Sequence, residues 1–261
     1  MAIAGVFQNE APFLKEWIEF HKLVGVEHFV LIDDNSTDDY LATLQPYIEK
    51  GEVEVERWAC PDALRGRRFT EYQRSVYQSL LAYFRGIARW VAFIDIDEFI
   101  VPSEQGSIPR FLREHEEYGA IYVHWEQFGT SYISKLSEGE LMTSQLTMKR
   151  RFEKGRDVFG KSIVKPHCAI LAEVHECKLI DGFRYLDTNP GMLNEQPQIK
   201  IHHYWSRDEQ YLFGQKLPRA ARLKGWDFLE GQEAYFRALF NEVADHTMAR
   251  YSTELHARVL G

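Results

Sequence analysis

The stretch VAFIDIDEFIVP, residues 91–102, places three carboxylates directly after a run of large apolar side chains. The run VAFI, residues 91–94, predicts a buried strand, and Asp95, Asp97 and Glu98 follow at its carboxyl end. Carboxylates this close repel one another, and burying them costs free energy unless a positive partner is bound there. The stretch therefore predicts a sheet edge that holds a positively charged ligand.

Strands and helices alternate around this stretch. Apolar runs predict strands at residues 2–7, 27–34 and 52–58, and helical spacing predicts helices at residues 11–25, 40–51 and 69–87. Strands that alternate with helices form a mostly parallel sheet in an α/β fold, and such a sheet binds ligands at the carboxyl ends of its strands. The acids of VAFIDIDEFIVP and of LIDDNSTDD, residues 31–39, fall at that edge.

After residue 118 the pattern changes to longer strand-like runs with little helix between them. These runs are AIYVHWEQFGTSYI (120–133), KSIVKPHCAILAEVHECKLI (161–180) and QIKIHHYW (198–205). From about Glu209 onward the sequence is again typical of helices. We expect one α/β domain over residues 1–216, and a helical extension over residues 217–261 packed on it.

Composition excludes some classes of protein. The 261 residues include 31 Lys and Arg against 39 Asp and Glu, a net charge of −8, which does not favour a nucleic-acid-binding protein. The odd number of cysteines, 3, favours a reducing compartment over a disulfide framework. No basic leader or run of about 18 apolar residues is present, so we expect no membrane span and no export.

Asp95 and Asp97 form a DxD pattern whose oxygens suit a divalent cation. In an extended segment their side chains point to the same face, about 7 Å apart, and Glu98 points to the other. Mg²⁺ and Mn²⁺ prefer such oxygen ligands and keep other positions for water or phosphate. The alternative is a solvated acidic turn, although the apolar run before the acids weighs against it.

Asp33 and Asp34 end another strand of the predicted sheet. Their carboxylates could accept hydrogen bonds from a nucleobase or from ribose hydroxyls. The residues that follow, Asn35 to Asp38, suit an Asx-type turn and a helix cap. Both readings can hold together, with the turn structural and the aspartates functional.

Histidines and a lysine supply further candidates. His202 and His203 are adjacent on a predicted strand and point to opposite faces, so at most one of them shares a metal with the aspartates. The alternative for the strand histidine, and also for His175, is a structural role as a hydrogen-bonded side chain packed in the fold. Lys161 could contact a phosphate as a point charge, or it could be a solvated surface lysine.

Several stretches resemble one family when they are taken together. They are QNEAPFLKEWIEFHKLVGVEHFVLIDDNSTDD (8–39), WVAFIDIDEFIVP (90–102), WEQFGTS (125–131), KSIVKP (161–166), VHE (174–176) and HHYWSRDEQYLFGQK (202–216). In this order the set resembles glycosyltransferase family 92 and its family 2-like bacterial relatives, over roughly residues 3–216. Each stretch is weak by itself, and the set is specific.

The resemblance implies a GT-A fold, a nucleotide-sugar donor that is usually UDP-linked, a divalent metal (Mn²⁺ or Mg²⁺) on the DxD aspartates, and transfer with inversion. It places Asn9 and Glu10 on the first nucleotide-binding loop, Asp33 and Asp34 beside base and ribose, Asp95 and Asp97 at the diphosphate and metal, Trp125 to Gly129 on the acceptor side, and His203 at the metal or a phosphate.

The catalytic base is where the sequence departs from the family 2 pattern. Many of those enzymes present an acidic pair to the acceptor hydroxyl, and no equivalent pair stands here. Inversion needs a base within about 3 Å of that hydroxyl. Glu126 and His175 are the candidates, and Glu126 could equally be a polar strand residue. We expect one displacement at the anomeric carbon, with the metal on Asp95, Asp97 and His203 stabilising the departing diphosphate.

Two other functions remain open. FIDIDEF, residues 93–99, also resembles the first motif of haloacid-dehalogenase phosphatases, although Phe99 stands where those usually have Thr or Val. A degenerate transferase that binds nucleotide or sugar without turnover would explain the missing base. Bacterial relatives act on lipopolysaccharide, capsule or other surface glycans, which implies a glycan or glycolipid acceptor and cytoplasmic work, with peripheral membrane association.

Overall fold

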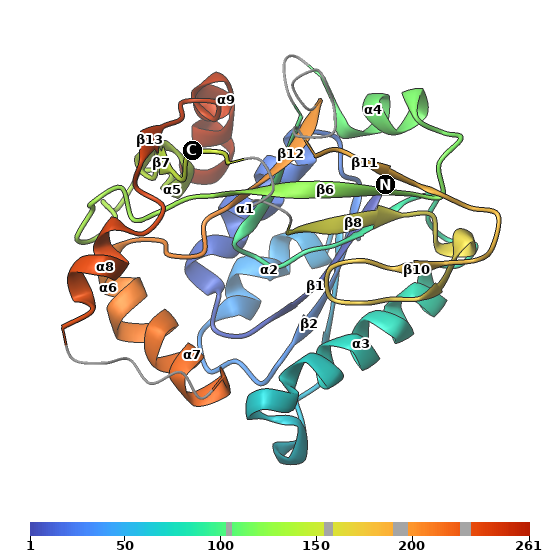
Figure 1. Ribbon diagram of the computed structural model, residues 1–261, viewed down its shortest axis with the longest axis horizontal. Coiled ribbons are helices and arrows are strands. Elements are labelled where there is room, and N and C mark those ends of the chain that lie inside the picture. Colours follow the sequence, from blue (N-terminus) through green and yellow to red (C-terminus); the bar gives the residue numbers. More distant parts are fainter. Residues whose placement is uncertain (103–105, 154–158, 190–197, 225–230) are drawn as a thin grey trace.

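The computed structural model describes residues 1–102, 106–153, 159–189, 198–224 and 231–261 (Figure 1). The first elements are β1 (Ala2–Phe7), α1 (Ala11–Leu23), β2 (His28–Asp33), α2 (Tyr40–Ile48), β3 (Val53–Arg57), η1 (Asp62–Leu64), η2 (Gly66–Arg68), α3 (Phe69–Phe84), β4 (Val91–Phe93), β5 (Glu98–Pro102) and α4 (Ile108–Glu114). They are followed by β6 (Ala120–Gln127), α5 (Met142–Gln145), β7 (Met148–Lys149), β8 (Gly160–Val164), η3 (Pro166–Cys168), β9 (Ala169–Leu171), β10 (Lys178–Leu179), β11 (Tyr185–Asp187) and β12 (Ile199–His203). The last elements are α6 (Glu209–Tyr211), the π-helical turn η4 (Leu212–Lys216), α7 (Leu217–Lys224), α8 (Glu233–Ala238), β13 (Val243–Ala244) and α9 (Ala249–Leu260).

The central sheet has the strand order β3-β2-β1-β4-β8-β6-β12-β5, and β11 also pairs with β6. β1 is parallel to β2 and β4, β2 to β3, and β6 to β11 and β12. β8 is antiparallel to β4 and β6, and β5 is antiparallel to β12. The mixed, mostly parallel sheet confirms the α/β class expected from the alternation of strands and helices.

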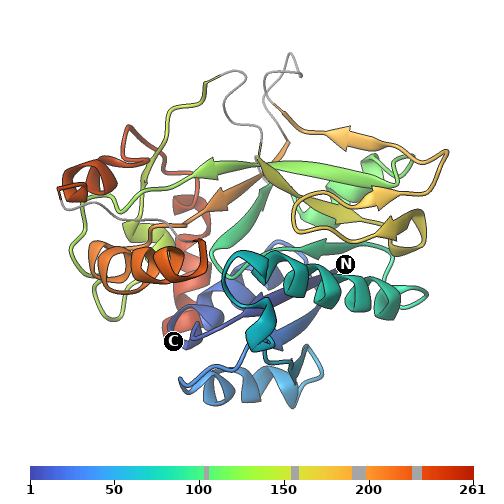
Figure 2. The ribbon, with the colours of Figure 1, turned by 60° about the horizontal axis from the view of Figure 1, so that its bottom comes forward.

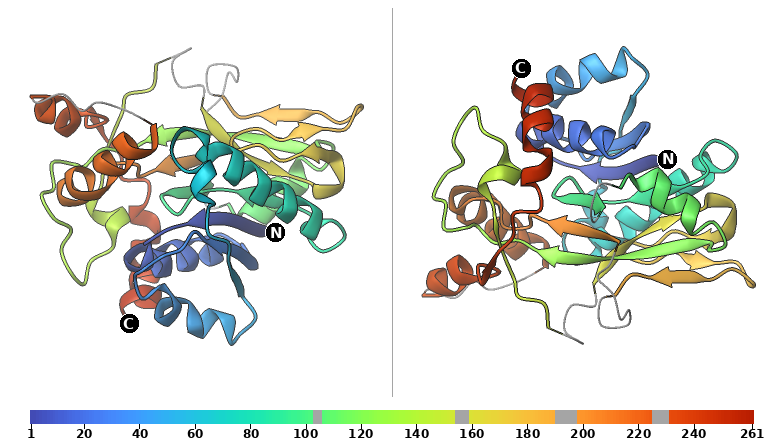
Figure 3. Two further views of the ribbon diagram at one scale, coloured as in Figure 1. Left: turned by 90° about the horizontal axis from the view of Figure 1, so that it is seen from below. Right: turned by 90° about the horizontal axis from the view of Figure 1, so that it is seen from above.

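Helices cover both faces of the sheet, with α1 and α2 on one side and α3 on the other (Figures 2 and 3). Alternate residues of β1 therefore enter two different apolar clusters. Ile3 packs in the cluster that contains Trp17 of α1, and Ala4 packs in the cluster that contains Tyr77 of α3. Burial on both faces explains why β1 is apolar throughout its length.

The turn between β4 and β5 shows that the sheet curls. Four residues, 94–97, separate these strands, yet β8, β6 and β12 lie between them in the sheet order. In a flat sheet the two strands would lie about 19 Å apart, whereas the linking residues reach about 17 Å when fully extended. They are not extended, because the Glu98 N–H donates to the Asp95 carbonyl at 3.1 Å. The expectation of an extended segment with Asp95 and Asp97 on one face is therefore wrong.

Residues 217–261 contain α7, α8 and α9, as expected, and also the strand β13, which pairs with β7. α9 lies beside α1, where the rings of Tyr251 and Phe20 are 5.3 Å apart. The expected boundary after residue 216 falls inside a helical stretch that runs from α6 through η4 to α7, so the division stays a prediction. Within the described part of the chain, no helix is both long and apolar enough to cross a membrane.

Gly5 is the point at which β1 lies closest to the chain that leads into the acids. A Cβ atom at this position would lie 2.7 Å from the carbonyl oxygen of Ile94, a residue whose N–H is fixed by donating to the Ala4 carbonyl. We expect Gly5→Ala to lower the free energy of unfolding by about 1–3 kcal/mol, the usual cost of overpacking a core. Urea unfolding followed by tryptophan fluorescence measures this change. Gly214→Ala is the matched control, since nothing lies within 4 Å of its added Cβ, and equal midpoints for the two variants would contradict the prediction.

Candidate active site

A cavity of about 930 Å³ lies where β1, β2 and β4 end. Its lining includes Gln8, Glu10, Asp34, Gln73, Asp95, Ile96, Asp97, Trp125, Gln127, Arg150, His175, His203, Lys216 and Arg219. Eight residues proposed from the sequence therefore meet at one cavity: Glu10, Asp34, Asp95, Asp97, Trp125, Gln127, His175 and His203. The carboxyl ends of parallel strands meet at one edge, which explains why segments this far apart in sequence converge.

Asp95 is held by side chains from β8 and α3. The Lys161 ammonium lies 2.9 Å from Asp95 Oδ2, and Gln73 donates to Oδ1 at 3.1 Å. Lys161 also lies 3.4 Å from Glu98 Oε2, and its side chain is only 1% exposed. Burial favours the neutral amine, but the carboxylates of Asp95 and Glu98 outweigh it and raise the pKa of Lys161. Lys161 is therefore placed as an internal counter-ion, and contact with a phosphate would require breaking these pairs.

Asp97 faces two nitrogen atoms. The Lys216 ammonium donates to Oδ2 at 2.6 Å, and His203 Nε2 lies 3.5 Å from Oδ1. Burial alone would raise the pKa of Asp97, but Lys216 and His203 hold it well below the ordinary value. Burial lowers the pKa of His203 in spite of Asp97, so the imidazole is neutral at pH 7 and has a lone pair to offer.

The Asp97 and His203 atoms fit a divalent cation. Neighbouring ligands of an octahedral ion at about 2.1 Å are about 3 Å apart, which is close to the observed 3.5 Å between Oδ1 and Nε2. A carboxylate oxygen suits Mg²⁺ and Mn²⁺ and an imidazole nitrogen suits transition-metal ions, so this pair of ligand atoms is compatible with a divalent cation without selecting one. Asp95 contributes to the same rim of the cavity, although its oxygens face Lys161, Gln73 and Tyr77.

His202 and His203 point to opposite faces of β12, as the sequence predicts. The same alternation along β6 turns Glu126 away from the cavity. Trp125 and Gln127 of β6 line the cavity, so Glu126 between them faces the opposite side. There Glu126 lies 3.3 Å from His202 Nε2 and 2.8 Å from both Lys149 and Lys200.

Asp245 completes this second cluster. Among the described residues, Glu126, His202 and Asp245 form the acid and histidine group whose possible ligand atoms all lie within 4.8 Å of one another. Lys149 pairs with both carboxylates, and Lys200 lies 3.7 Å from Asp245. The two lysines balance the two acids, so the cluster is already neutral without a metal.

Asn9 and Asp33 form hydrogen bonds that hold the loop after β1 and the loop after β2 in shape. Asp33 is fully buried, and its carboxylate accepts from the Ser36 N–H at 2.7 Å and the Tyr40 hydroxyl at 3.1 Å. Asn9 has a left-handed backbone, with φ of 56°, and its side chain accepts from the Thr37 N–H. These two residues shape the loops, whereas the adjacent Glu10 and Asp34 line the cavity.

Arg207 and Lys216 are functional candidates that the sequence patterns did not single out. The buried Arg207 guanidinium pairs with Glu10 and lies over the rings of Phe13 and Tyr211, at 3.5 and 4.5 Å from their centroids. Both cations lie in HHYWSRDEQYLFGQK, but their acidic partners stand 197 and 119 residues earlier. The sequence marks the stretch and gives no sign of these pairings.

His175 reaches the cavity from the segment between β9 and β10. Its Nδ1–H donates to the Gly160 carbonyl at 3.1 Å, which leaves Nε2 with the lone pair. His175 remains accessible from the cavity, and partial desolvation together with the Lys161 charge lowers the pKa of its ring, which is therefore neutral at pH 7. A neutral imidazole with an accepting nitrogen can take a proton from a hydroxyl.

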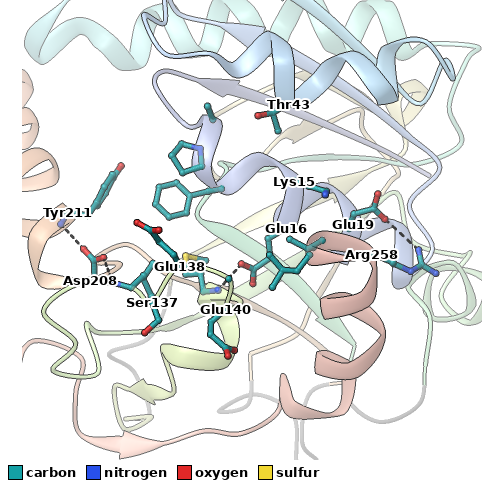
Figure 4. A pocket seen from close by; sticks show the side chains of 18 of the residues that line it. Lys15, Glu16, Glu19, Thr43, Ser137, Glu138, Glu140, Asp208, Tyr211 and Arg258 are labelled. Atoms are coloured by element: carbon teal, nitrogen blue, oxygen red, sulfur yellow. Dashed lines mark hydrogen bonds and ion pairs between the residues drawn. The ribbon is translucent and has the colours of Figure 1, made fainter.

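A second cavity of about 890 Å³ lies between α1, the loop at residues 135–140 and α9 (Figure 4). Acidic and basic side chains both line it: Glu19 lies 3.7 Å from Arg258, and Asp208 accepts from the backbone N–H groups of Leu136 and Tyr211. Asn9 lines this cavity. Asp95 and Asp97 of VAFIDIDEFIVP line the first cavity, which is therefore the candidate active site.

A cavity at the carboxyl ends of the strands is typical of α/β proteins that bind a ligand at that edge of the sheet. The relatives of this chain are glycosyltransferases. The sequence model of glycosyltransferase family 92 matches residues 1–205, and the chain belongs to this family. This membership gives the haloacid-dehalogenase alternative no support.

Individual relatives agree with this assignment. A glycosyltransferase family 92 protein of Ricinus communis is 28% identical over 214 residues, 78% of this chain and 35% of that protein. Galactan beta-1,4-galactosyltransferase GALS2 of Arabidopsis thaliana is 35% identical over 127 residues, 46% of this chain and 24% of that protein. The chain thus spans about a third of the length of the family 92 relatives it matches. Among solved structures, TarS 1-349 of S. aureus is similar at a TM-score of 0.44 and 12% identity, covering 91% of this chain and 69% of that one.

Glu98 should make the stability of the protein depend on pH. Burial raises the pKa of Glu98 to about 8 from an ordinary value of 4.5, although Lys161 opposes the shift. Between these values the folded chain keeps a proton that the unfolded chain releases. The free energy of unfolding should therefore fall as the pH rises, by at most about 1.4 kcal/mol per pH unit.

Glu98→Gln cannot titrate and should flatten this dependence. Urea unfolding from about pH 5 to pH 9 measures the slope for the wild type, Glu98→Gln and the surface control Glu117→Gln. Parallel curves for the wild type and Glu98→Gln would contradict the assignment of the proton to Glu98.

Proposed function

We propose that the protein transfers a sugar from a UDP-linked donor to a hydroxyl of a glycan or glycolipid, with inversion at the anomeric carbon. The observation that carries the proposal is the meeting of Asp34, Asp95, Asp97, His203 and Lys216 around one cavity at the carboxyl edge of the sheet. Carboxylates at such an edge can accept hydrogen bonds from the ribose and the base or bind a metal ion. Cationic side chains there can pair with a diphosphate. A GT-A arrangement of the donor is part of this proposal.

The donor lies across the strand ends in this proposal. Asp34, which accepts from the Cys60 N–H at 2.6 Å, is fixed beside the nucleoside. Lys216, which lies 2.6 Å from Asp97, and Arg219, which also lines the cavity, offer positive charge to the diphosphate. The galactosyltransferase relative makes UDP-galactose the first donor to test and a β-1,4-linked galactan the first acceptor. The cytoplasmic, membrane-peripheral place of action rests on the family resemblance alone.

Asp97 and His203 would hold Mn²⁺ or Mg²⁺. The bound cation would supply positive charge to the departing diphosphate, as a Lewis acid does. The chain itself contributes Lys216, whose ammonium already lies 2.6 Å from Asp97. The Lys216 ammonium is part of the folded chain. It would therefore supply some of the positive charge that stabilises the departing diphosphate, in addition to the charge of the cation.

His175 is the base in this proposal. The acceptor oxygen attacks the anomeric carbon, the bond from that carbon to the UDP oxygen breaks, and UDP departs with the electron pair. The acceptor proton moves to His175 Nε2, the nitrogen left free by the hydrogen bond to Gly160. Glu126 is not assigned this role, because its carboxylate faces Lys149, Lys200 and His202 on the other side of β6.

Nucleotide binding tests the donor site. UDP, GDP, CDP or dTDP is added with Mn²⁺ or with EDTA, and the melting temperature is measured. We expect UDP with Mn²⁺ to stabilise the wild type by about 2.7 kcal/mol at 100 times the dissociation constant. Asp97→Asn should lose most of this effect, and the exposed control Asp181→Asn should keep it. A wild type that responds to none of the nucleotides would overturn the proposed donor class.

Turnover tests the base. UDP release from UDP-galactose in the presence of a β-1,4-galactan oligosaccharide should fall about 10²–10⁴-fold in His175→Gln, the usual effect of losing a general base. UDP binding should persist in this variant. Glu126→Gln should retain turnover per folded molecule, since its contacts lie outside the cavity. The opposite pattern would assign the base to Glu126.

A further inference from the structure

Beyond the acids, the wall of the active-site cavity is aromatic. Its lining there includes Trp125, Phe159, Trp205, Tyr235, Phe236 and Phe240. Two of these side chains are unusually accessible for large apolar groups, Phe159 at 59% and Tyr235 at 62% exposure. Aromatic side chains that are exposed inside a cavity, with no core around them, are typical of ligand-binding surfaces.

The helix α8 brings two of these rings to the cavity without burying them. None of its residues from Glu233 to Ala238 is buried, and the rings of Tyr235 and Phe236 lie edge to face at 5.3 Å. Phe240 follows with a left-handed backbone, φ of 63°, a strained conformation for a bulky residue. Packing of the core therefore does not account for the position of Tyr235, which is 62% exposed.

Asn241 fixes this segment to the end of β6. Its amide donates to Thr130 Oγ1 at 3.1 Å, and its carbonyl oxygen accepts from the Ser131 N–H at 2.8 Å. Asn241 itself is 6% exposed. A Cβ atom on Gly129 would lie 2.3 Å from Asn241 Oδ1, so glycine is needed for this close approach. The aromatic segment is thus held in place by the stretch WEQFGTS.

The strand order places this wall on the side of the cavity where the acceptor must enter. Asp34 follows β2, whereas Trp125 lies on β6, and β4 with its acids stands between them in the sheet. A donor whose nucleoside lies beside Asp34 and whose diphosphate lies at Asp97 directs its sugar toward β6 and β12. The acceptor hydroxyl must approach that sugar from the far side.

We propose that Trp125, Phe159, Tyr235 and Phe236 form an acceptor subsite for the pyranose rings of a neutral glycan. The C–H faces of a pyranose ring are apolar and flat, and they stack on aromatic rings as other apolar groups do. Two of the four residues belong to α8, outside the part of the chain that the family model matches. This inference rests on the proposed function, because the direction of the donor sets the acceptor side.

Direct binding of neutral tetrasaccharides tests the subsite without turnover. β-1,4-galactotetraose, cellotetraose, maltotetraose and mannotetraose are titrated onto the wild type with UDP and Mn²⁺ present, and the dissociation constants are measured by calorimetry. We expect at least one of them to bind, and the variant with Tyr235→Ala and Phe236→Ala to bind it about tenfold more weakly. UDP affinity should not change, and Tyr235→Phe should bind like the wild type.

Tyr83→Ala is the matched control, since Tyr83 is a 40% exposed aromatic residue on α3, paired with Glu54. Gly129→Ala should weaken tetrasaccharide binding, because the added methyl group displaces Asn241 and with it the aromatic segment. UDP binding should stay intact. The inference is overturned if UDP binds and no tetrasaccharide does, or if the aromatic variant binds as the wild type does. Absence of UDP binding together with retained tetrasaccharide binding would instead count against the proposed donor.

Discussion

The buried ammonium of Lys161 holds the acidic turn on which the active site is built. It lies between Asp95 and Glu98, and the Glu98 carbonyl also accepts from the Trp17 indole N–H at 2.8 Å. Without this cation, the Asp95 carboxylate would lack its positive partner beside the buried Glu98, which keeps its proton up to a pKa of about 8, and an unpaired charge there is costly. The lysine thus ties the turn to β8, while Trp17 ties it to α1. The stretch VAFIDIDEFIVP thus has the positive partner that its acids require, and this partner is a side chain of the protein itself.

The fixed turn explains the curl of the sheet and, through the curl, the composition of the cavity. Because β5 leaves β4 after four residues, β12 and β6 are brought round toward the end of β4. Strand alternation then decides which side chains face the acids: Trp125 and His203 do, and Glu126 and His202 do not. Two neighbouring polar clusters with similar residue types therefore have different surroundings. One meets an open cavity, and the other is neutralised by lysines.

Local patterns in the sequence predict the early elements well, since β1, β2, β3, α1 and α3 depend on apolar periodicity within one segment. They also place Asp34, Asp95 and Asp97 correctly at one edge of the sheet. They fail where the partner lies far along the chain. The pairs of Asp97 with Lys216 and of Glu10 with Arg207 have no local signature, and the turn after β4 depends on contacts with β8 and α1. The orientation of Glu126 similarly depends on the register of β6 with β12.

The attachment of the segment after α8 to Gly129 also bears on how such an enzyme can change during evolution. The proposed donor residues come from the ends of β2, β4 and β12 and from η4, whereas half of the aromatic wall comes from one short segment, residues 235–240, which Asn241 joins to Thr130 and Ser131. If the proposed acceptor subsite is correct, mutations in that segment would alter which glycan is accepted without disturbing the diphosphate end. New acceptor specificities could then arise by small steps, with the chemistry of transfer retained at each one.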